Sequence, residues 1–182
     1  MKQHTTSRRT ASHSNRRQRH IFEIFLLICL IIIGQRFFPE TPTSGTFQEA
    51  VLERVVDGDT IYATVDNTST KIRLIGINTP ESVAWDVSRN TPQGTLASDY
   101  VKELLPKGTV LYLEYDEEPL DQYDRTLAYV WLKKDADPTS FQDFCEYNLN
   151  AVILKNTYCN TMTFAPNDKY EDWFKRIAKE KN

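Results

Sequence analysis

Apolar and polar positions beyond residue 45 alternate in short runs, which predicts a domain built mainly of strands. Five runs are rich in β-branched and other apolar side chains: residues 47–56, 60–65, 71–76, 110–115 and 126–132. Turn sequences follow the first two runs, Asp-Gly-Asp at 57–59 and Asp-Asn-Thr at 66–68. The first three strands are therefore predicted to form a meander. The last run is apolar on both faces and is predicted to be buried.

Helical spacing appears between and after these strands. Residues 93–105 carry Ala97, Val101, Leu104 and Leu105 on one predicted helix face. A short helix is predicted at 148–155 and an amphipathic helix at 170–178, with a polar connector at 135–147. Three strands, a helix and two strands follow the chain order of the OB-fold. We therefore predict an α+β, β-rich domain over 46–182, a five-stranded OB barrel with about three helices.

The first 45 residues differ in character from this domain. Residues 1–20 are polar and basic without an acid, which predicts disorder, and residues 39–45 have the composition of a linker. Residues 21–38 are apolar with an uninterrupted core of 11 residues, and the 18 residues would span roughly 27 Å as a helix.

The apolar run at 21–38 is open to three interpretations. A membrane signal-anchor is favoured over a cleaved signal peptide, because no clear cleavage site follows, and over a buried core helix. The basic flank predicts a cytoplasmic N-terminus, and the domain would then be membrane-anchored outside the cytoplasm. Cleavage would instead give a secreted protein.

Charge divides the chain in a way that bears on its partners. The formal net charge is −3, but residues 1–45 carry +5 and the remainder carries −8. An acidic domain argues against a nucleic-acid partner, because phosphates are bound mainly through Lys and Arg. All three histidines lie in the basic terminus, which excludes histidine-based chemistry from the folded domain.

Cys145 and Cys159 would both lie in the exported part, where disulfides persist. A helix over 148–155 would hold the two thiols near its opposite ends, which works against a bridge. The bridged and the free state both stay open. Cys29 lies inside the apolar run and is expected to be inert.

The stretch 56–81 gathers side chains suited to cleaving a phosphodiester. Such a reaction needs a general base, cationic donors for the charge on the phosphoryl oxygens, and often a divalent ion. Glu81 is a candidate base, while Arg73 and the downstream Arg125 offer guanidinium forks for phosphate. Asp59 and Asn78 offer side-chain oxygens for a hard cation, and the carbonyl of the next residue, Thr79, offers another.

Four motifs carry a resemblance to a known family. V-D-G-D-T at 56–60, I-R-L-I-G-I-N-T-P-E at 72–81 and D-Q-Y-D-R-T-L-A-Y-V at 121–130 are followed by P-N-D-K-Y at 166–170. In this order, over roughly residues 46–179, they resemble the staphylococcal nuclease (thermonuclease) family. The resemblance implies an OB barrel that hydrolyses DNA and RNA with calcium and leaves 3′-phosphates.

The resemblance also assigns roles to individual residues. It implies catalytic roles for Arg73, Glu81 and Arg125, and it places Tyr123 near a bound nucleotide. It implies calcium ligation by Asp59, Asn78 and Thr79. The domain is expected to be monomeric.

Two positions depart from the family pattern. The second calcium carboxylate is Asn78 here, so one formal charge is lost and calcium binding is expected to be weaker. The residue before Arg125 is commonly glycine and is Asp124 here, a carboxylate that would compete with phosphate for the arginine. An alternative function is therefore a catalytically weak or inactive OB module that binds single-stranded nucleic acid, or a protein partner at the membrane surface.

Three other features have simpler explanations. Asp57 fits a turn or a supporting residue equally well. The acidic residues of 116–124 are predicted to form a solvated loop. The aromatic residues at strand spacing are predicted to be core rather than base-stacking: Tyr112, Tyr115, Tyr129 and Trp131.

Overall fold

The structure is a computed structural model that describes residues 47–82 and 87–181. Its strands are β1 (Gln48–Asp57), β2 (Thr60–Val65), β3 (Thr68–Leu74), β4 (Gly76–Asn78), β5 (Val110–Glu114), β6 (Thr126–Trp131) and β7 (Asn160–Met162). Its α-helices are α2 (Pro92–Leu104), α3 (Phe141–Tyr147), α4 (Leu149–Asn156) and α5 (Glu171–Lys181), and Val87–Arg89 form a 3₁₀ turn.

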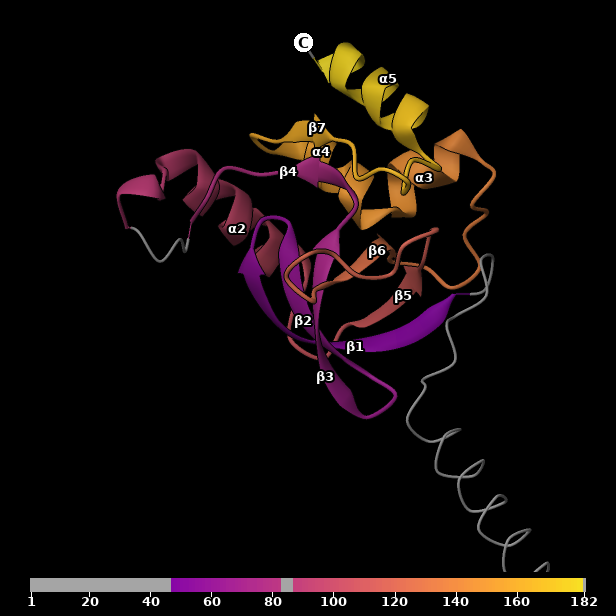
Figure 1. Ribbon diagram of the computed structural model, residues 1–182. Helices are drawn as coiled ribbons and strands as arrows, with labels where there is room; N and C mark the ends of the chain where they lie inside the picture. Colours follow the sequence, from indigo (N-terminus) through magenta and orange to yellow (C-terminus); the bar gives the residue numbers. More distant parts are fainter. Residues whose placement is uncertain (1–46, 83–86, 182) are drawn as a thin grey trace, which may run out of the picture. The chain divides into compact units, whose positions relative to one another are not determined.

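Five strands close into a barrel in the order β1-β2-β3-β6-β5, with β5 returning to β1 (Figure 1). All pairs are antiparallel except β3 with β6, in which Arg73 lies opposite Leu127. The prediction of a five-stranded barrel is confirmed. Its one parallel pair brings the start of β6 beside the end of β3.

The two central residues of the turn between β2 and β3 determine its conformation. Asp66 and Asn67 both adopt positive φ, at 46° and 63°. Successive left-handed residues match the right-handed twist of a two-residue hairpin, and Asp and Asn tolerate that conformation well. The hairpin therefore pairs Val65 with Thr68 directly and fixes the register of the two strands.

The hydrophobic core contains inward side chains of the five barrel strands together with buried residues of the helices. Tyr129 and Trp131 are almost fully buried, and Tyr115 is buried as well, which agrees with their predicted core role. The predicted helix face is also confirmed in part, because Ala97 and Val101 are buried where α2 packs on β1, whereas Leu104 is exposed. Burial of these apolar surfaces supplies the main stabilisation of the domain.

Two regions differ from the predicted elements. The connector predicted at 135–147 contains α3, which Ser140 caps by accepting a hydrogen bond from the amide of Asp143. The predicted third strand breaks after Leu74, and the chain continues as β4, which pairs with β7 in a separate two-stranded sheet. The described residues therefore contain four α-helices rather than three. Short elements of three to seven residues give too little periodicity for detection.

Asn150 ties this small sheet to the barrel. Its side chain is fully buried on α4. Its Oδ1 accepts the amide of Val130 at 3.1 Å, and its Nδ2 donates to the carbonyls of Ile75 at 2.8 Å and Ala128 at 3.3 Å. One amide thus satisfies backbone groups of Ile75, at the break between β3 and β4, and of Ala128 and Val130 on β6. It fixes the point at which the chain leaves the barrel.

Cys145 and Cys159 are both free thiols, so the bridged alternative is not observed. Burial raises the pKa of Cys159 to about 12, which makes it an unreactive, protonated thiol at neutral pH.

The predicted disordered terminus, membrane segment and linker at residues 1–45 lie outside the described residues and stay predictions. Within 47–82 and 87–181, no helix is long and apolar enough to cross a bilayer.

Candidate active site

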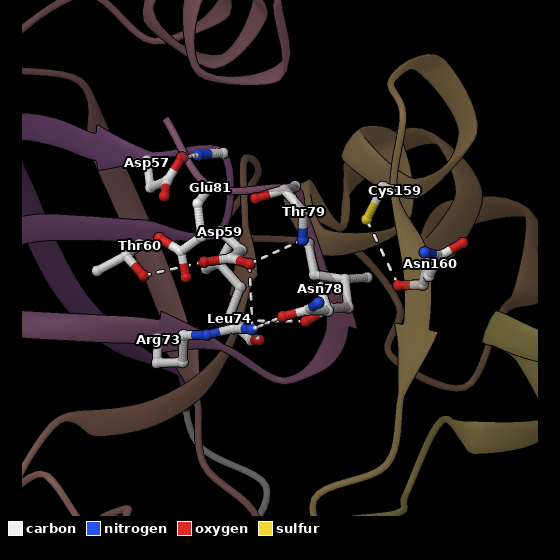
Figure 2. A network of polar contacts seen from close by, with 12 residues as sticks. Asp57, Asp59, Thr60, Arg73, Leu74, Asn78, Thr79, Glu81, Cys159 and Asn160 are labelled. Carbon is white, nitrogen blue, oxygen red and sulfur yellow. Dashed lines mark hydrogen bonds and ion pairs between the residues drawn. The ribbon is translucent and has the colours of Figure 1, made fainter. Parts of the chain in front are cut away.

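A buried ion pair forms the centre of the candidate site (Figure 2). Arg73 Nη2 lies 3.1 Å from Asp59 Oδ2 and donates to Asn78 Oδ1 at 3.0 Å. Asp59 Oδ2 also accepts the backbone amide of Thr79 at 2.8 Å, and Asp59 Oδ1 accepts the Thr60 hydroxyl at 3.0 Å. The structure therefore brings together four of the residues selected from the sequence, which come from the turn before β2, from β3, and from the end of β4 and the residue after it.

Arg73 also holds the bend between β3 and β4. Its Nη1 donates to the carbonyls of Leu74 at 2.8 Å and Ile77 at 2.9 Å. The side chain is only 5% exposed, and burial lowers the pKa of Arg73, opposed by the nearby Asp59 carboxylate. The guanidinium thus makes three hydrogen bonds and one ion pair with described residues. The arginine supports the site as well as facing it.

The Asp-Gly-Asp turn fits against the segment that follows β4. A Cβ atom on Gly58 would lie 2.8 Å from Thr79 Cγ2, so only glycine allows this approach. Asp57 Oδ1 accepts the Ser82 hydroxyl at 2.7 Å, and its Oδ2 lies 3.4 Å from the Ser82 amide. Asp57 is thus a supporting residue that holds the chain next to Glu81, the second of its two predicted roles.

Glu81 enters the same site from the loop after β4. Its side chain is 45% exposed and makes a long ion pair with Arg89, 3.7 Å between Oε1 and Nη2. Its carbonyl accepts the amide of Thr91 at 2.9 Å. The carboxylate of Glu81 therefore reaches solvent while its backbone is held.

Arg125 is held by Asp121 rather than by its neighbour. Its Nε and Nη2 lie 2.7 and 2.6 Å from Asp121 Oδ2, while Asp121 Oδ1 accepts the amides of Tyr123 and Arg125 at 2.8 and 3.0 Å. The expectation that Asp124 would pair with Arg125 is wrong. Asp124 has a φ of 56°, the left-handed conformation that glycine adopts most readily, which accounts for the usual glycine at this position.

The prediction that the acidic residues of 116–124 form a solvated loop is wrong for Asp121. Its side chain is only 9% exposed. Burial opposes its ionisation, but hydrogen bonds from the amides and guanidinium of the turn outweigh that effect, so the pKa of Asp121 is lowered. The D-Q-Y-D-R motif that begins at Asp121 was the signal that could have separated it from the other acids of this loop.

Asn167, from a distant part of the chain, holds the loop at 116–124 in place. It is 2% exposed, and it exchanges two hydrogen bonds of 2.8 Å with the backbone of Glu118. Sequence reasoning assigned it no role. The P-N-D-K-Y motif that contains it was the signal that could have identified it.

A single open pocket of about 630 Å³ joins these groups. It is lined by six of the seven residues selected from the sequence: Asp59, Arg73, Asn78, Glu81, Tyr123 and Arg125. Thr79 is buried behind it. The Tyr123 ring is 69% exposed at the edge and lies 5.4 Å from the Arg125 guanidinium. Side chains separated by up to 66 positions thus face one cavity.

Comparison with known proteins decides the family. The profile of staphylococcal nuclease homologues matches residues 71–181. The chain is 36% identical over 157 residues to the thermonuclease of Staphylococcus intermedius, covering 86% of this chain and 85% of that protein. It is 33% identical over 167 residues to the thermonuclease of Staphylococcus hyicus, covering 86% and 89%. The chain belongs to the staphylococcal nuclease family.

A further relative agrees with the same activity. Endonuclease YhcR of Bacillus subtilis is 32% identical over 141 residues, which is 74% of this chain and 11% of that longer protein. The protein is accordingly a nuclease, a hydrolase of phosphodiester bonds, and its substrate is nucleic acid.

The nuclease pocket carries more negative than positive side chains. Five carboxylates line it, from Asp57, Asp59, Glu81, Glu118 and Asp121, against only three cations, from Lys71, Arg73 and Arg125. The closest carboxylate to each arginine is already paired with it. A phosphate entering this pocket would meet a formal excess of two negative charges, which a divalent cation would cancel.

The oxygens near Arg73 limit what kind of cation site the pocket can form. In the described part of the chain, no three or more His, Cys, Asp or Glu residues cluster as a metal site. A site here would therefore combine one carboxylate, Asp59, with the Asn78 amide oxygen, the Thr79 carbonyl and water. Oxygen donors of this kind suit a hard cation such as Ca²⁺.

Replacing Asp121 by Asn should destabilise the protein in a pH-dependent way. Because its pKa is lowered on folding from an ordinary value of 3.8, the carboxylate contributes stability above pH 3.8 that is lost as pH falls through its lower folded-state pKa. Urea unfolding should show Asp121→Asn less stable by about 1–2 kcal/mol at pH 7, the scale of charged hydrogen bonds, with the difference shrinking below pH 3.8. Asp124→Asn, an equal charge change in the same turn, is the control. Equal losses in both variants would contradict the role of Asp121.

Proposed function

We propose that this nuclease cuts DNA and RNA with calcium as its cofactor, and that Glu81 is the general base. Arg73 and Arg125 would stabilise the charge that develops on the phosphate. The observation that carries the proposal is that these three side chains and the candidate ion ligands Asp59 and Asn78 line one pocket. A module that only binds nucleic acid has no need to gather a base and two guanidinium groups around one cavity.

Glu81 is suited to take a proton from water because its carboxylate is accessible. The side chain is 45% exposed, and its ion pair with Arg89 is long and solvated. Exposed ion pairs of this kind contribute little and are easily exchanged. The carboxylate is therefore available to a water that attacks phosphorus from the pocket.

Arg125 is suited to bind phosphate because its guanidinium is held by one edge only. Nε and Nη2 pair with Asp121, and Arg125 lines the pocket, so its Nη1 group would be the one to meet a phosphate there. A guanidinium fixed in this way meets phosphate oxygens without first losing side-chain freedom. Tyr123, exposed beside it, offers a ring surface for a nucleotide.

Arg73 would take part through a change of partners. Its Nη2 is shared between Asp59 and Asn78, the same oxygens proposed as calcium ligands. When bound, the ion would supply positive charge to the phosphoryl oxygens and to the attacking water. Nη1 would still hold the bend through Leu74 and Ile77 if the Nη2 group turned from these oxygens to a phosphate. Arg73 would therefore stay fixed through Nη1 while Nη2 contacts phosphate.

Cleavage of single-stranded DNA by the purified protein, with calcium and with excess chelator, tests the proposal. We expect cutting that requires calcium. No cutting at any calcium concentration would contradict the calcium-dependent enzyme and favour the alternative of a module that only binds nucleic acid.

Glu81→Gln should lower the cleavage rate by at least about 10²-fold, the scale expected for loss of a general base, while leaving the unfolding transition unchanged. The measurement is kcat on single-stranded DNA at saturating calcium. Glu118→Gln removes the same charge from an exposed residue of the same pocket and should have a far smaller effect. Comparable losses in the two variants would show that pocket charge, and not a base at Glu81, sets the rate.

Asn78→Asp should reduce the calcium concentration that gives half the maximal rate, because it returns a formal charge to the ligand set. We expect a shift of roughly tenfold, which corresponds to about 1.4 kcal/mol of binding free energy. Asn160→Asp is the control, since Asn160 pairs with Asn78 across β4 and β7 and places the same charge on the neighbouring strand. A calcium requirement that stays equal or rises in Asn78→Asp would show that Asn78 is not a ligand.

A further inference from the structure

Helix α2 begins against the backbone of Glu81, ten positions earlier in the chain. The amide of Thr91 donates to the Glu81 carbonyl at 2.9 Å, and the Thr91 hydroxyl lies 3.5 Å from the same oxygen. Thr91 is also the N-cap of α2, because its hydroxyl accepts the amide of Gly94 at 3.0 Å. One residue therefore starts the helix and holds the carbonyl of the proposed base.

Gly94 allows this contact by having no side chain. A Cβ atom at this position would lie 2.2 Å from the Glu81 carbonyl oxygen, 2.5 Å from its carbonyl carbon and 2.6 Å from the Pro80 oxygen. All three atoms belong to the backbone, so no side-chain rotation could make room. Alanine is favoured over glycine inside a helix, and a glycine here acts against the stability of α2. The close approach to Glu81 accounts for it.

The opposite side of this segment is held as well. Ser82 is bound to Asp57 through its hydroxyl at 2.7 Å, and the Thr79 amide is bound to Asp59 at 2.8 Å. Hydrogen bonds to Asp57 and Asp59 of the Asp-Gly-Asp turn therefore hold the chain on one side of Glu81. The hydrogen bond to the start of α2 holds it on the other side. Since its own carboxylate makes only the long ion pair with Arg89 among described residues, these backbone contacts set its place.

We propose that Thr91 and Gly94 are positioning residues for Glu81, acting through its backbone at the first turn of α2. This inference rests on the proposed role of Glu81 as general base. An alanine methyl at position 94 requires the Glu81 backbone to move by about 1 Å, a displacement that can lower a rate by about 10²-fold when it misplaces a reacting group.

A double-mutant cycle between positions 94 and 81 tests the inference. Gly94→Ala should lower kcat on single-stranded DNA by between about 10- and 10²-fold with little change in KM, because substrate contacts at Arg73 and Arg125 are unaffected. In the Glu81→Gln background the same substitution should change kcat by less than about threefold, because the group that it displaces is no longer a base. Gln93→Ala, on the exposed side of the same helical turn, is the control and should leave kcat unchanged.

Thr91 provides a second, milder test if Gly94→Ala fails to fold. Thr91→Val removes the cap oxygen and should lower kcat, and Thr91→Ser, which restores that oxygen, should recover it. Both variants are also measured in the Glu81→Gln background, where Thr91→Val should have no further effect.

The outcomes separate this inference from the proposed function. A Glu81→Gln protein with the original rate would overturn both. A slow Glu81→Gln protein in which Gly94→Ala or Thr91→Val lowers kcat by the same factor as in the original background would overturn only the positioning role. A folded Gly94→Ala protein with the original kcat would also overturn only the positioning role.

Discussion

The buried guanidinium of Arg73 is the contact on which the site depends. It joins the end of β3 to β4 through the carbonyls of Leu74 and Ile77, and it joins both to the Asp-Gly-Asp turn through Asp59. A buried cation is costly unless it is paired and hydrogen-bonded, and this guanidinium has three hydrogen bonds and an ion pair with Asp59. This arginine therefore helps to hold the bend that carries Asn78, Thr79 and Glu81 out of the barrel. Substitutions of Arg73 would disturb both the fold and the chemistry. The Glu81 side chain lies at the end of this hydrogen-bond network, so it can be replaced without disturbing the fold.

The second requirement is closure of the barrel. Arg125 lies just before β6, and the parallel pairing of β6 with β3 places Leu127 opposite Arg73. Asp121 and Asn167 then fix the loop that carries Arg125, one by the guanidinium and the turn amides, the other by the backbone of Glu118. The two arginines thus reach one pocket from different elements, one from β3 and the other from the loop before β6. Each is already paired with a carboxylate before a phosphate binds. This pairing explains how an acidic domain can keep two cations ready for phosphate.

Sequence patterns predicted the barrel because alternation and turn chemistry are local signals, as at Asp66-Asn67. They also predicted which side chains meet, since the motif order of a known family carries long-range information that periodicity lacks. They missed β4, β7 and α3, which are too short for a period to show. They also misassigned the partner of Arg125, because adjacency in sequence favoured Asp124 while the left-handed turn at that residue brings Asp121 to the guanidinium. The positions of Thr91 and Gly94 against Glu81 had no sequence signal, because they depend on how α2 packs.

The most direct test is a structure of the protein crystallised with calcium and a short non-hydrolysable single-stranded oligonucleotide. We expect one phosphate contacted by both Arg73 and Arg125, an ion bound by Asp59, Asn78 and the Thr79 carbonyl, and Glu81 within hydrogen-bonding reach of a water facing phosphorus. A phosphate bound away from the two arginines, or an ion held instead by the acidic residues of 116–124, would contradict this expectation.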